Sequence, residues 1–167
     1  MEIVYIGLGS NLADPQAQVE RALDALAGLT RTRLLRRSRL YRSAPWGRAD
    51  QPEFVNAVAA LETDLAPREL LDALLAIERD AGRERGATRW GPRVLDLDIL
   101  SYGERVMNDP GLHLPHPHLH ERAFVLMPLA EVAPELIVAG RGNVAALLRQ
   151  IDASGCTPLE IAGASNR

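Results

Sequence analysis

The sequence predicts an α+β fold. Short β-branched and apolar runs alternate with amphipathic helical patterns, in the order strand, helix, strand, strand, helix, strand. This order is the split βαβ arrangement of ferredoxin-like βαββαβ domains, which gives a mostly antiparallel four-stranded sheet with two helices on one face. Further helical patterns near the C-terminus are expected to cover part of the other face. A chain of 167 residues suits one domain, so we expect a single domain over 1–167, with a polar and flexible tail after about residue 155.

Each element follows from a local pattern. Residues 2–8 are β-branched and apolar, as in a strand. A helix is expected to follow, because Asp14 suits an N-cap, Pro15 the first helical turn and Gly28 the exit. The remaining strands are expected within 33–42, at 54–63 and at 94–100, and the remaining helices at 66–81, around 121–131 and near 143–151.

Composition narrows the function classes. The 19 basic and 22 acidic side chains give a net charge of −3, and 4% of residues are aromatic, which argues against general nucleic-acid binding. Cys156 is the single cysteine, so neither an internal disulfide nor a cysteine-based zinc site is expected. Glu2 stands where a signal peptide carries positive charge, and no apolar run approaches the length of a membrane span. We therefore expect a cytoplasmic protein with neither a membrane nor a nucleic-acid partner.

The stretch RWGPRVLDLDIL, residues 89–100, places two acids in an otherwise apolar strand. Because strand side chains alternate, Asp96 and Asp98 share one face, with Cβ atoms about 7 Å apart at a rise of about 3.3 Å per residue. Two carboxylates at that spacing suit one or two divalent cations, and hard oxygen ligands favour magnesium. The alternative is a strand with one solvated face, as antiparallel sheets commonly have.

The segment before this strand is rich in arginine and glycine. Residues 79–93 hold five arginines against two acids, together with three glycines. Arginine matches phosphate oxygens and stays charged at neutral pH, so a polyphosphate is the expected ligand. A solvated surface loop and a nucleic-acid-binding loop are alternatives. The cationic loop and the paired carboxylates together favour phosphoryl transfer. The chain lacks the GxxxxGK[ST] motif, so a P-loop enzyme is not expected.

Four stretches in the same order resemble the 6-hydroxymethyl-7,8-dihydropterin pyrophosphokinase family. They are YIGLGSNL, DQPEFVNAV, RWGPRVLDLDIL and LPHPHLHERAFVLMPLAEVAPEL, and the resemblance extends from residue 3 to about 138. The resemblance implies transfer of the β,γ-pyrophosphoryl unit of ATP to the hydroxymethyl group of the reduced pterin, releasing AMP, in folate biosynthesis. It also implies two magnesium ions on Asp96 and Asp98. The expected partners are these two small molecules, and the expected state is a monomer.

The resemblance also implies roles for individual residues. Positions that contact ATP phosphates or support transfer are matched by Arg83, Arg93, His116 and Arg122, and positions lining or approaching the nucleotide by Glu78, Arg85, Arg89 and Ile99. The rings that sandwich the pterin are matched by Trp90 and Phe124, its edge is read by Asn56, and the loop over it is matched by Ser43, Ala44 and Trp46. Phe54 stands where a tyrosine can occur in the pterin site, and the nucleotide side departs from the family at Leu75 and Pro117.

The four histidines, His113, His116, His118 and His120, suggest a zinc site as an alternative. No cysteine accompanies them and their spacing fits no zinc template, which favours a phosphate-facing His116 with histidines on the surface. A further hypothesis is that titration of His116 makes activity pH-dependent. Two other functions stay open: a ferredoxin-like RNA-binding module and a metal-dependent phosphohydrolase.

Overall fold

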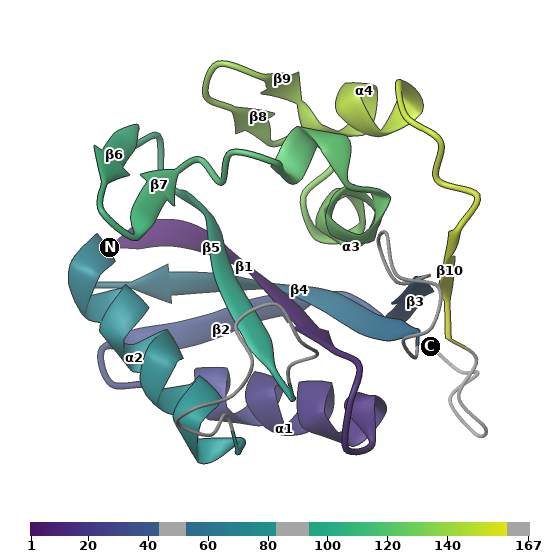
Figure 1. Ribbon diagram of the computed structural model, residues 1–167. Helices are drawn as coiled ribbons and strands as arrows, with labels where there is room; N and C mark the ends of the chain where they lie inside the picture. The colour runs from purple at the N-terminus through teal and green to yellow at the C-terminus, as the bar shows by residue number, and fades with distance from the viewer. Residues whose placement is uncertain (44–52, 83–93, 160–167) are drawn as a thin grey trace.

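The structure, a computed structural model, describes residues 1–43, 53–82 and 94–159. Within these ranges a sheet lies between two layers of helices (Figure 1). The elements of the sheet and its helices are β1 (Glu2–Ser10), α1 (Pro15–Ala27), β2 (Thr32–Arg37), β3 (Tyr41–Ser43), β4 (Phe54–Thr63), α2 (Pro67–Asp80), β5 (Asp96–Tyr102), α3 (Ala123–Val132), α4 (Val144–Arg149) and β10 (Cys156–Pro158). Two hairpins and a short 3₁₀ helix complete the described part: β6 (Met107–Asp109) with β7 (Leu112–Leu114), β8 (Ile137–Val138) with β9 (Gly142–Asn143), and η1 (Leu119–Glu121).

All strand pairs in the described sheet are antiparallel, in the order β10-β3-β4-β1-β5, with β2 also pairing with β4. The central strands are therefore β1 and β4, the first and third long strands of the predicted βαββαβ order. This confirms the α+β fold and the mostly antiparallel sheet. β5 pairs with β1 alone within the described sheet, so it forms one edge.

The two faces of the sheet carry separate apolar cores. On one face, Leu23 of α1 and Leu70 and Leu74 of α2 join a core with Ile6 and Leu97 of the strands. The helices begin where the sequence predicts, since the Asp14 carboxylate accepts a hydrogen bond from the Ala17 amide and Pro67 opens α2.

On the other face, Leu126 and Leu129 of α3 and Val144 of α4 join a second core with Val58 and Leu100. The expected cover of this face by C-terminal helices is therefore present, and α3 lies across the sheet (Figure 1). A part-buried hydrogen bond joins α3 to β3, because the Tyr41 hydroxyl donates to Glu131 Oε1 at 2.6 Å.

Two local predictions differ from the structure. The strand expected within 33–42 is divided into β2 and β3, because the Ser38 amide and hydroxyl bond to Val58 and interrupt the run. Residues 156–158 are not tail, since they pair with β3 as β10. β3 and β10 are each only three residues long, which is too short to establish an alternating pattern.

Candidate active site

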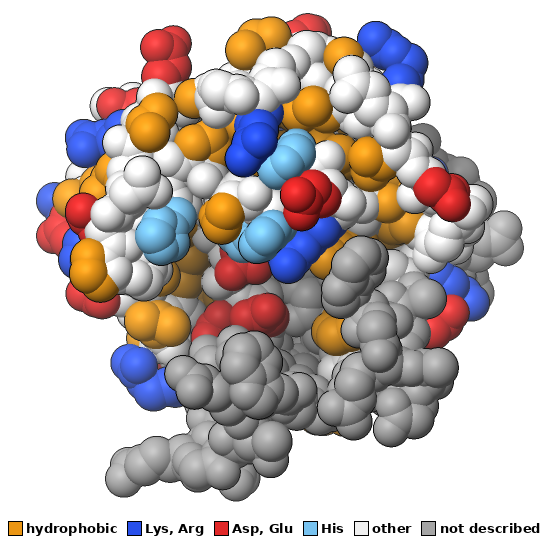
Figure 2. All heavy atoms as spheres, turned by 45° about the horizontal axis from the view of Figure 1, so that its top comes forward, with side chains coloured by type: hydrophobic (Ala, Val, Ile, Leu, Met, Phe, Trp, Pro, Cys, Tyr) orange, Lys and Arg blue, Asp and Glu red, His pale blue; other side chains and the backbone are white. Residues whose placement is uncertain are grey.

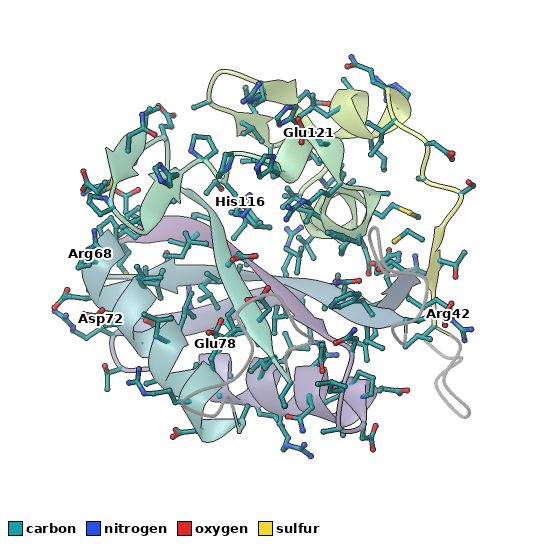
Figure 3. The ribbon with its side chains drawn as sticks, in the orientation of Figure 1. Arg42, Arg68, Asp72, Glu78, His116 and Glu121 are labelled. Atoms are coloured by element: carbon teal, nitrogen blue, oxygen red, sulfur yellow. The ribbon has the colours of Figure 1, made fainter. Side chains whose placement is uncertain are left out.

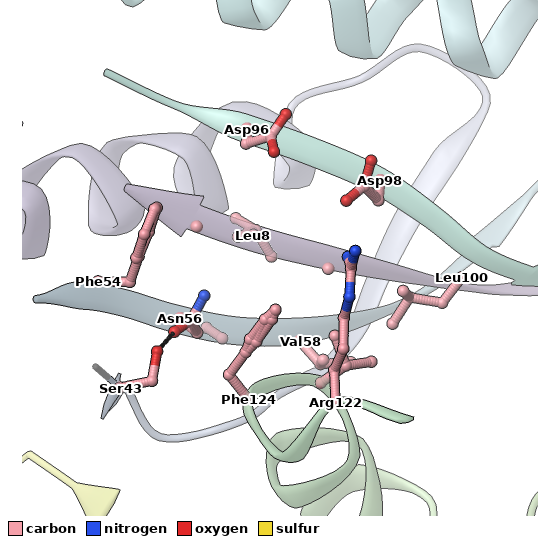
Figure 4. A pocket seen from close by; sticks show the side chains of 14 residues that line it. Leu8, Ser43, Phe54, Asn56, Val58, Asp96, Asp98, Leu100, Arg122 and Phe124 are labelled. Atoms are coloured by element: carbon pink, nitrogen blue, oxygen red, sulfur yellow. Dashed lines mark hydrogen bonds between the residues drawn. The ribbon is translucent and has the colours of Figure 1, made fainter. Parts of the chain in front are cut away.

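A cavity of about 190 Å³ lies on the α3 face of the sheet. Farther along the strands the same face carries Val58 and Leu100, which pack under α3 and α4 in the second core. The cavity begins where α3 and α4 no longer cover the sheet, so the strand side chains at that end line the cavity. It is lined by Gly7, Leu8, Gly9, Ser43, Phe54, Asn56, Ala57, Val58, Asp96, Asp98, Leu100, Arg122, Phe124 and Val125 (Figure 4).

The floor of the cavity is bare backbone of β1. Gly7 is paired with Asp98 on β5, and Gly9 is paired with Asp96 on β5 and Asn56 on β4. A Cβ at Gly9 would lie 3.0 Å from Nδ2 of Asn56, closer than such atoms normally approach. The missing side chains therefore let Asn56 of β4 and Leu100 of β5 lie close against the β1 backbone at the base of the cavity.

Asp96 and Asp98 form the β5 side of the cavity, which confirms the prediction that they share one face. Leu97 and Ile99 are 4% and 6% exposed and belong to the core on the opposite face. Two carboxylates are therefore presented on the cavity side of a strand whose other side is anchored in the core.

Arg122 brings a cation to the same cavity from the start of α3. Its Cζ lies 5.5 Å from the ring centroid of Phe124, a distance at which a guanidinium is attracted to an aromatic face. Figure 4 shows Arg122 reaching from α3 toward the β5 side, where Asp98 lies. The cavity thus combines a fixed positive charge with two acidic groups, an arrangement suited to a metal-bound anion.

The Asn56 amide is held in one orientation by Ser43. The Ser43 hydroxyl donates a hydrogen bond of 2.7 Å to Asn56 Oδ1, and both residues are buried (Figure 4). Because Oδ1 is engaged with Ser43, the Nδ2 group is the one that lies over the Gly9 backbone. The pair can therefore present an amide donor to a polar ligand edge, next to the Phe124 ring.

His116 is tied to the edge of this region through its backbone and its ring. Its amide donates to Leu100 O at 2.9 Å, and its Nδ1 accepts from the His118 amide at 3.1 Å. Burial, with smaller contributions from Arg122 and from neighbouring histidines, lowers the pKa of His116 from 6.5 to about 4. The imidazole is therefore neutral at pH 7, and because Nδ1 is an acceptor, the proton sits on Nε2.

We expect His116 in the ligand-free protein to titrate near pH 4, as the Nε2–H tautomer above that pH. As pH falls from 6.5 toward 4 the unfolded chain binds a proton that the folded chain does not, so the free energy of unfolding decreases across this window. ¹⁵N-detected NMR titration of the histidine rings measures both properties, with a His116→Gln variant to assign the resonance. A midpoint near 6.5 would restore the hypothesis that this group makes activity pH-dependent around neutrality.

The remaining histidines do not assemble a metal centre with it. Figure 2 shows histidine side chains gathered on one face beside basic and acidic groups. His118 and His120 lie 3.0 and 3.5 Å from the carboxylate of Glu121. Across residues 1–43, 53–82 and 94–159, no group of three or more His, Cys, Asp or Glu side chains is placed to hold a metal ion. The zinc alternative gains no support from this arrangement.

The predicted site residues fall into three groups. The cavity brings together Ser43, Phe54, Asn56, Asp96, Asp98, Arg122 and Phe124. Three predicted residues do not line the cavity. Glu78 is 2% exposed and contacts β5, the Ile99 side chain lies in the core on the opposite face, and His116 is partly buried. Outside the described residues lie Ala44, Trp46, Arg83, Arg85, Arg89, Trp90 and Arg93.

Sequence reasoning missed the glycine floor, because the strand at residues 2–8 is expected from its β-branched and apolar residues alone. Gly7 and Gly9 alternate with apolar residues inside a strand. A glycine at every second position of a strand leaves one face without side chains, which is a signal for close approach of a ligand.

The model of the 7,8-dihydro-6-hydroxymethylpterin-pyrophosphokinase family matches residues 5–134. The chain belongs to this family. A Pseudomonas aeruginosa relative named 2-amino-4-hydroxy-6-hydroxymethyldihydropteridine pyrophosphokinase is 59% identical over 133 residues, which are 80% of this chain and 82% of that protein. A Methylorubrum extorquens protein of the same name is 45% identical over 160 residues, covering 96% of this chain and 100% of the relative.

Solved structures support the pyrophosphokinase fold independently of close sequence identity. Plasmodium falciparum HPPK-DHPS with pteroate superimposes with a TM-score of 0.70 at 14% identity, over 89% of this chain and 42% of that one. The chain thus spans less than half the length of that protein, and the likeness concerns the fold.

Within the described residues, no helix combines the length and apolar character that a membrane span requires.

Proposed function

We propose that the chain transfers the β,γ-pyrophosphoryl unit of ATP to the hydroxymethyl group of 6-hydroxymethyl-7,8-dihydropterin, releasing AMP, as a step of folate biosynthesis. One observation carries the proposal: groups suited to a flat polar heterocycle and groups suited to a metal-bound polyphosphate line the same cavity. Asn56 and Phe124 are of the first kind, and Asp96, Asp98 and Arg122 of the second. Membership of the pyrophosphokinase family supports the reaction class.

Magnesium, as two ions, is the proposed cofactor, held by Asp96 and Asp98. The residues fit it, because magnesium usually takes one or two protein carboxylates and fills its remaining positions with water and substrate phosphates. The two acids line one cavity, and in the part of the chain that the structure describes they join no third His, Cys, Asp or Glu. When bound, the metal neutralises phosphate charge and orients the reacting oxygens.

The protein's own groups are proposed to position the substrates and to stabilise charge. Phe124 contacts the pterin face, and the Asn56 amide, oriented by Ser43, bonds its edge. Arg122 supplies a fixed cation toward the phosphates, and His116 donates from Nε2–H as a neutral group. Charged and polar groups that are already oriented before the reaction need no reorganisation when charge develops in the transition state. The roles proposed for Ala44, Trp46, Trp90 and the arginines at 83, 85, 89 and 93 concern residues that the structure does not describe.

The decisive experiment incubates the purified chain with ATP, Mg²⁺ and the reduced hydroxymethylpterin, and follows nucleotides and pterins by chromatography. We expect AMP and pterin diphosphate in equal amounts. ADP or free phosphate without pterin diphosphate would instead favour the phosphohydrolase, and RNA binding without nucleotide turnover would favour the RNA-binding module. Gel filtration in the same buffer tests the proposed monomer, and cell fractionation tests the proposed cytoplasmic location.

A further inference from the structure

Glu78 is a buried acid of helix α2 that contacts β5, the strand that carries the two aspartates. It is 2% exposed, and its Oε2 accepts a hydrogen bond of 2.7 Å from the backbone amide of Leu97. Leu97 is the residue between Asp96 and Asp98. The contact therefore joins helix α2, on which Figure 3 labels Glu78, to the midpoint of the paired carboxylates.

The topology explains why this amide needs a partner from outside the sheet. β5 pairs with β1 on one side, in the register Gly9 with Asp96, Leu8 with Leu97 and Gly7 with Asp98. In an antiparallel pair, alternate residues direct their backbone groups toward the partner strand and away from it. An amide directed away from the partner at a sheet edge is left unpaired unless another group covers it, and buried amides are almost always paired. Glu78 supplies that acceptor.

The same helix also fixes the Leu97 side chain. Leu70, Leu74 and Glu78 follow one another at intervals of four residues, so they form a single stripe along α2. Leu70 and Leu74 belong to the core that contains Leu97, and Glu78 continues the stripe where the Leu97 amide lies. Both the side chain and the amide of Leu97 are thus held by α2, and Asp96 and Asp98 on either side face the cavity.

We propose that Glu78 is a positioning residue: through the Leu97 amide it sets the placement of Asp96 and Asp98, and it acts on the reaction through them without touching the nucleotide. This inference rests on the proposed function for its catalytic consequence only. Its structural part concerns the free protein. It replaces the nucleotide contact that the family resemblance implies for Glu78, because the carboxylate is buried against the outer edge of β5 and is not part of the cavity lining.

Two substitutions separate positioning from nucleotide contact. Glu78→Gln keeps a side-chain oxygen that accepts from the Leu97 amide, whereas Glu78→Leu keeps an apolar stripe and removes the acceptor. Asp72→Asn is the matched control, because Asp72 is an exposed acid on the same helix (Figure 3). A displacement of the aspartates of about 1 Å is enough to lower the transfer rate by about 10²-fold.

The first measurement is hydrogen exchange of the Leu97 amide by NMR, in protein without nucleotide or metal. We expect slow exchange in the unchanged chain and in Glu78→Gln and Asp72→Asn, and exchange faster by about 10-fold, the loss of about one hydrogen bond, in Glu78→Leu. Exchange of this amide at the rate of an exposed one in the unchanged chain would overturn the proposal, even if Glu78→Leu failed to fold. This result does not depend on whether the chain transfers pyrophosphate.

The second measurement is a steady-state and binding comparison of the same variants. We expect kcat to fall by about 10²-fold in Glu78→Leu, to recover to within tenfold in Glu78→Gln, and the Kd of ATP without metal to stay within threefold in both. The Mg²⁺ concentration for half-maximal rate is expected to rise only in Glu78→Leu. A rise in the Kd of metal-free ATP with unchanged Leu97 exchange would instead assign Glu78 to the nucleotide. An unchanged chain that transfers no pyrophosphate would refute the proposed function and leave the exchange result standing.

Discussion

Replacing Asp98 with asparagine is expected to lower the rate of pyrophosphoryl transfer by about 10³-fold or more, even at saturating magnesium. The amide keeps the shape of the side chain on β5 and removes the charge that a divalent cation needs. Asp98 lines the cavity beside Gly7 and faces away from the apolar core, so the substitution changes the cavity and leaves the packing of the core unchanged. The measurement is the rate of AMP and pterin diphosphate formation over a range of Mg²⁺ concentrations.

Asp109→Asn provides the control, because it makes the same chemical change at an exposed position on β6. Its transfer rate is expected to equal that of the unchanged chain, and both variants are expected to unfold at about the same temperature. Asparagine keeps the shape of the side chain and its capacity to accept hydrogen bonds at this cavity position, so the variant is expected to remain folded. A nearly normal transfer rate for Asp98→Asn would contradict the metal role of this pair.

The paired aspartates were predictable because strand alternation is a local property. Once residues 94–100 are recognised as a strand, Asp96 and Asp98 share one face and the apolar residues between and beside them share the other. The long strand β4 and the helices α1 and α2 were predictable for the same reason, since each contains enough residues to repeat its hydrophobic pattern.

The hydrogen bonds that orient the site depend on contacts between distant parts of the chain. Ser43 and Asn56 are 13 residues apart, and they meet because Ser43 pairs with Phe54 and lies diagonally across from Asn56 in the β3–β4 register. No local pattern specifies that register. The same holds for Glu78 and Leu97, which are brought together by the packing of α2 against β5.

Glu78 did leave a signal in the sequence, although its meaning required the fold. It occupies the position that an apolar residue would take on the Leu70–Leu74 stripe of α2. An acid on the buried stripe of an amphipathic helix is costly unless a hydrogen-bond donor meets it, so its presence predicts a donor on the facing element. The identity of that donor, an amide at the sheet edge, becomes clear only when β5 is placed beside α2.

Asn56→Leu is the second substitution with a large expected effect, and its effect falls on the pterin. The change keeps the approximate volume and removes the amide that Ser43 orients over the cavity. A bound pterin would then bury polar edge groups without partners, at about 1–3 kcal/mol for each group. We therefore expect kcat/KM for the pterin to fall by about 10²- to 10³-fold, measured with ATP and Mg²⁺ saturating.

The Kd of ATP is expected to change by less than threefold in this variant, because Asn56 lies on β4, across the Gly9 floor from the β5 aspartates. Ser43→Ala tests the orienting bond by itself: the amide remains, but its Oδ1 loses the 2.7 Å donor, so a smaller loss of about tenfold is expected. Ser43→Thr keeps a hydroxyl and should retain most of the activity. Equal losses for the pterin and for ATP in Asn56→Leu would mean that the amide supports the whole cavity, and would contradict its assignment to the pterin edge.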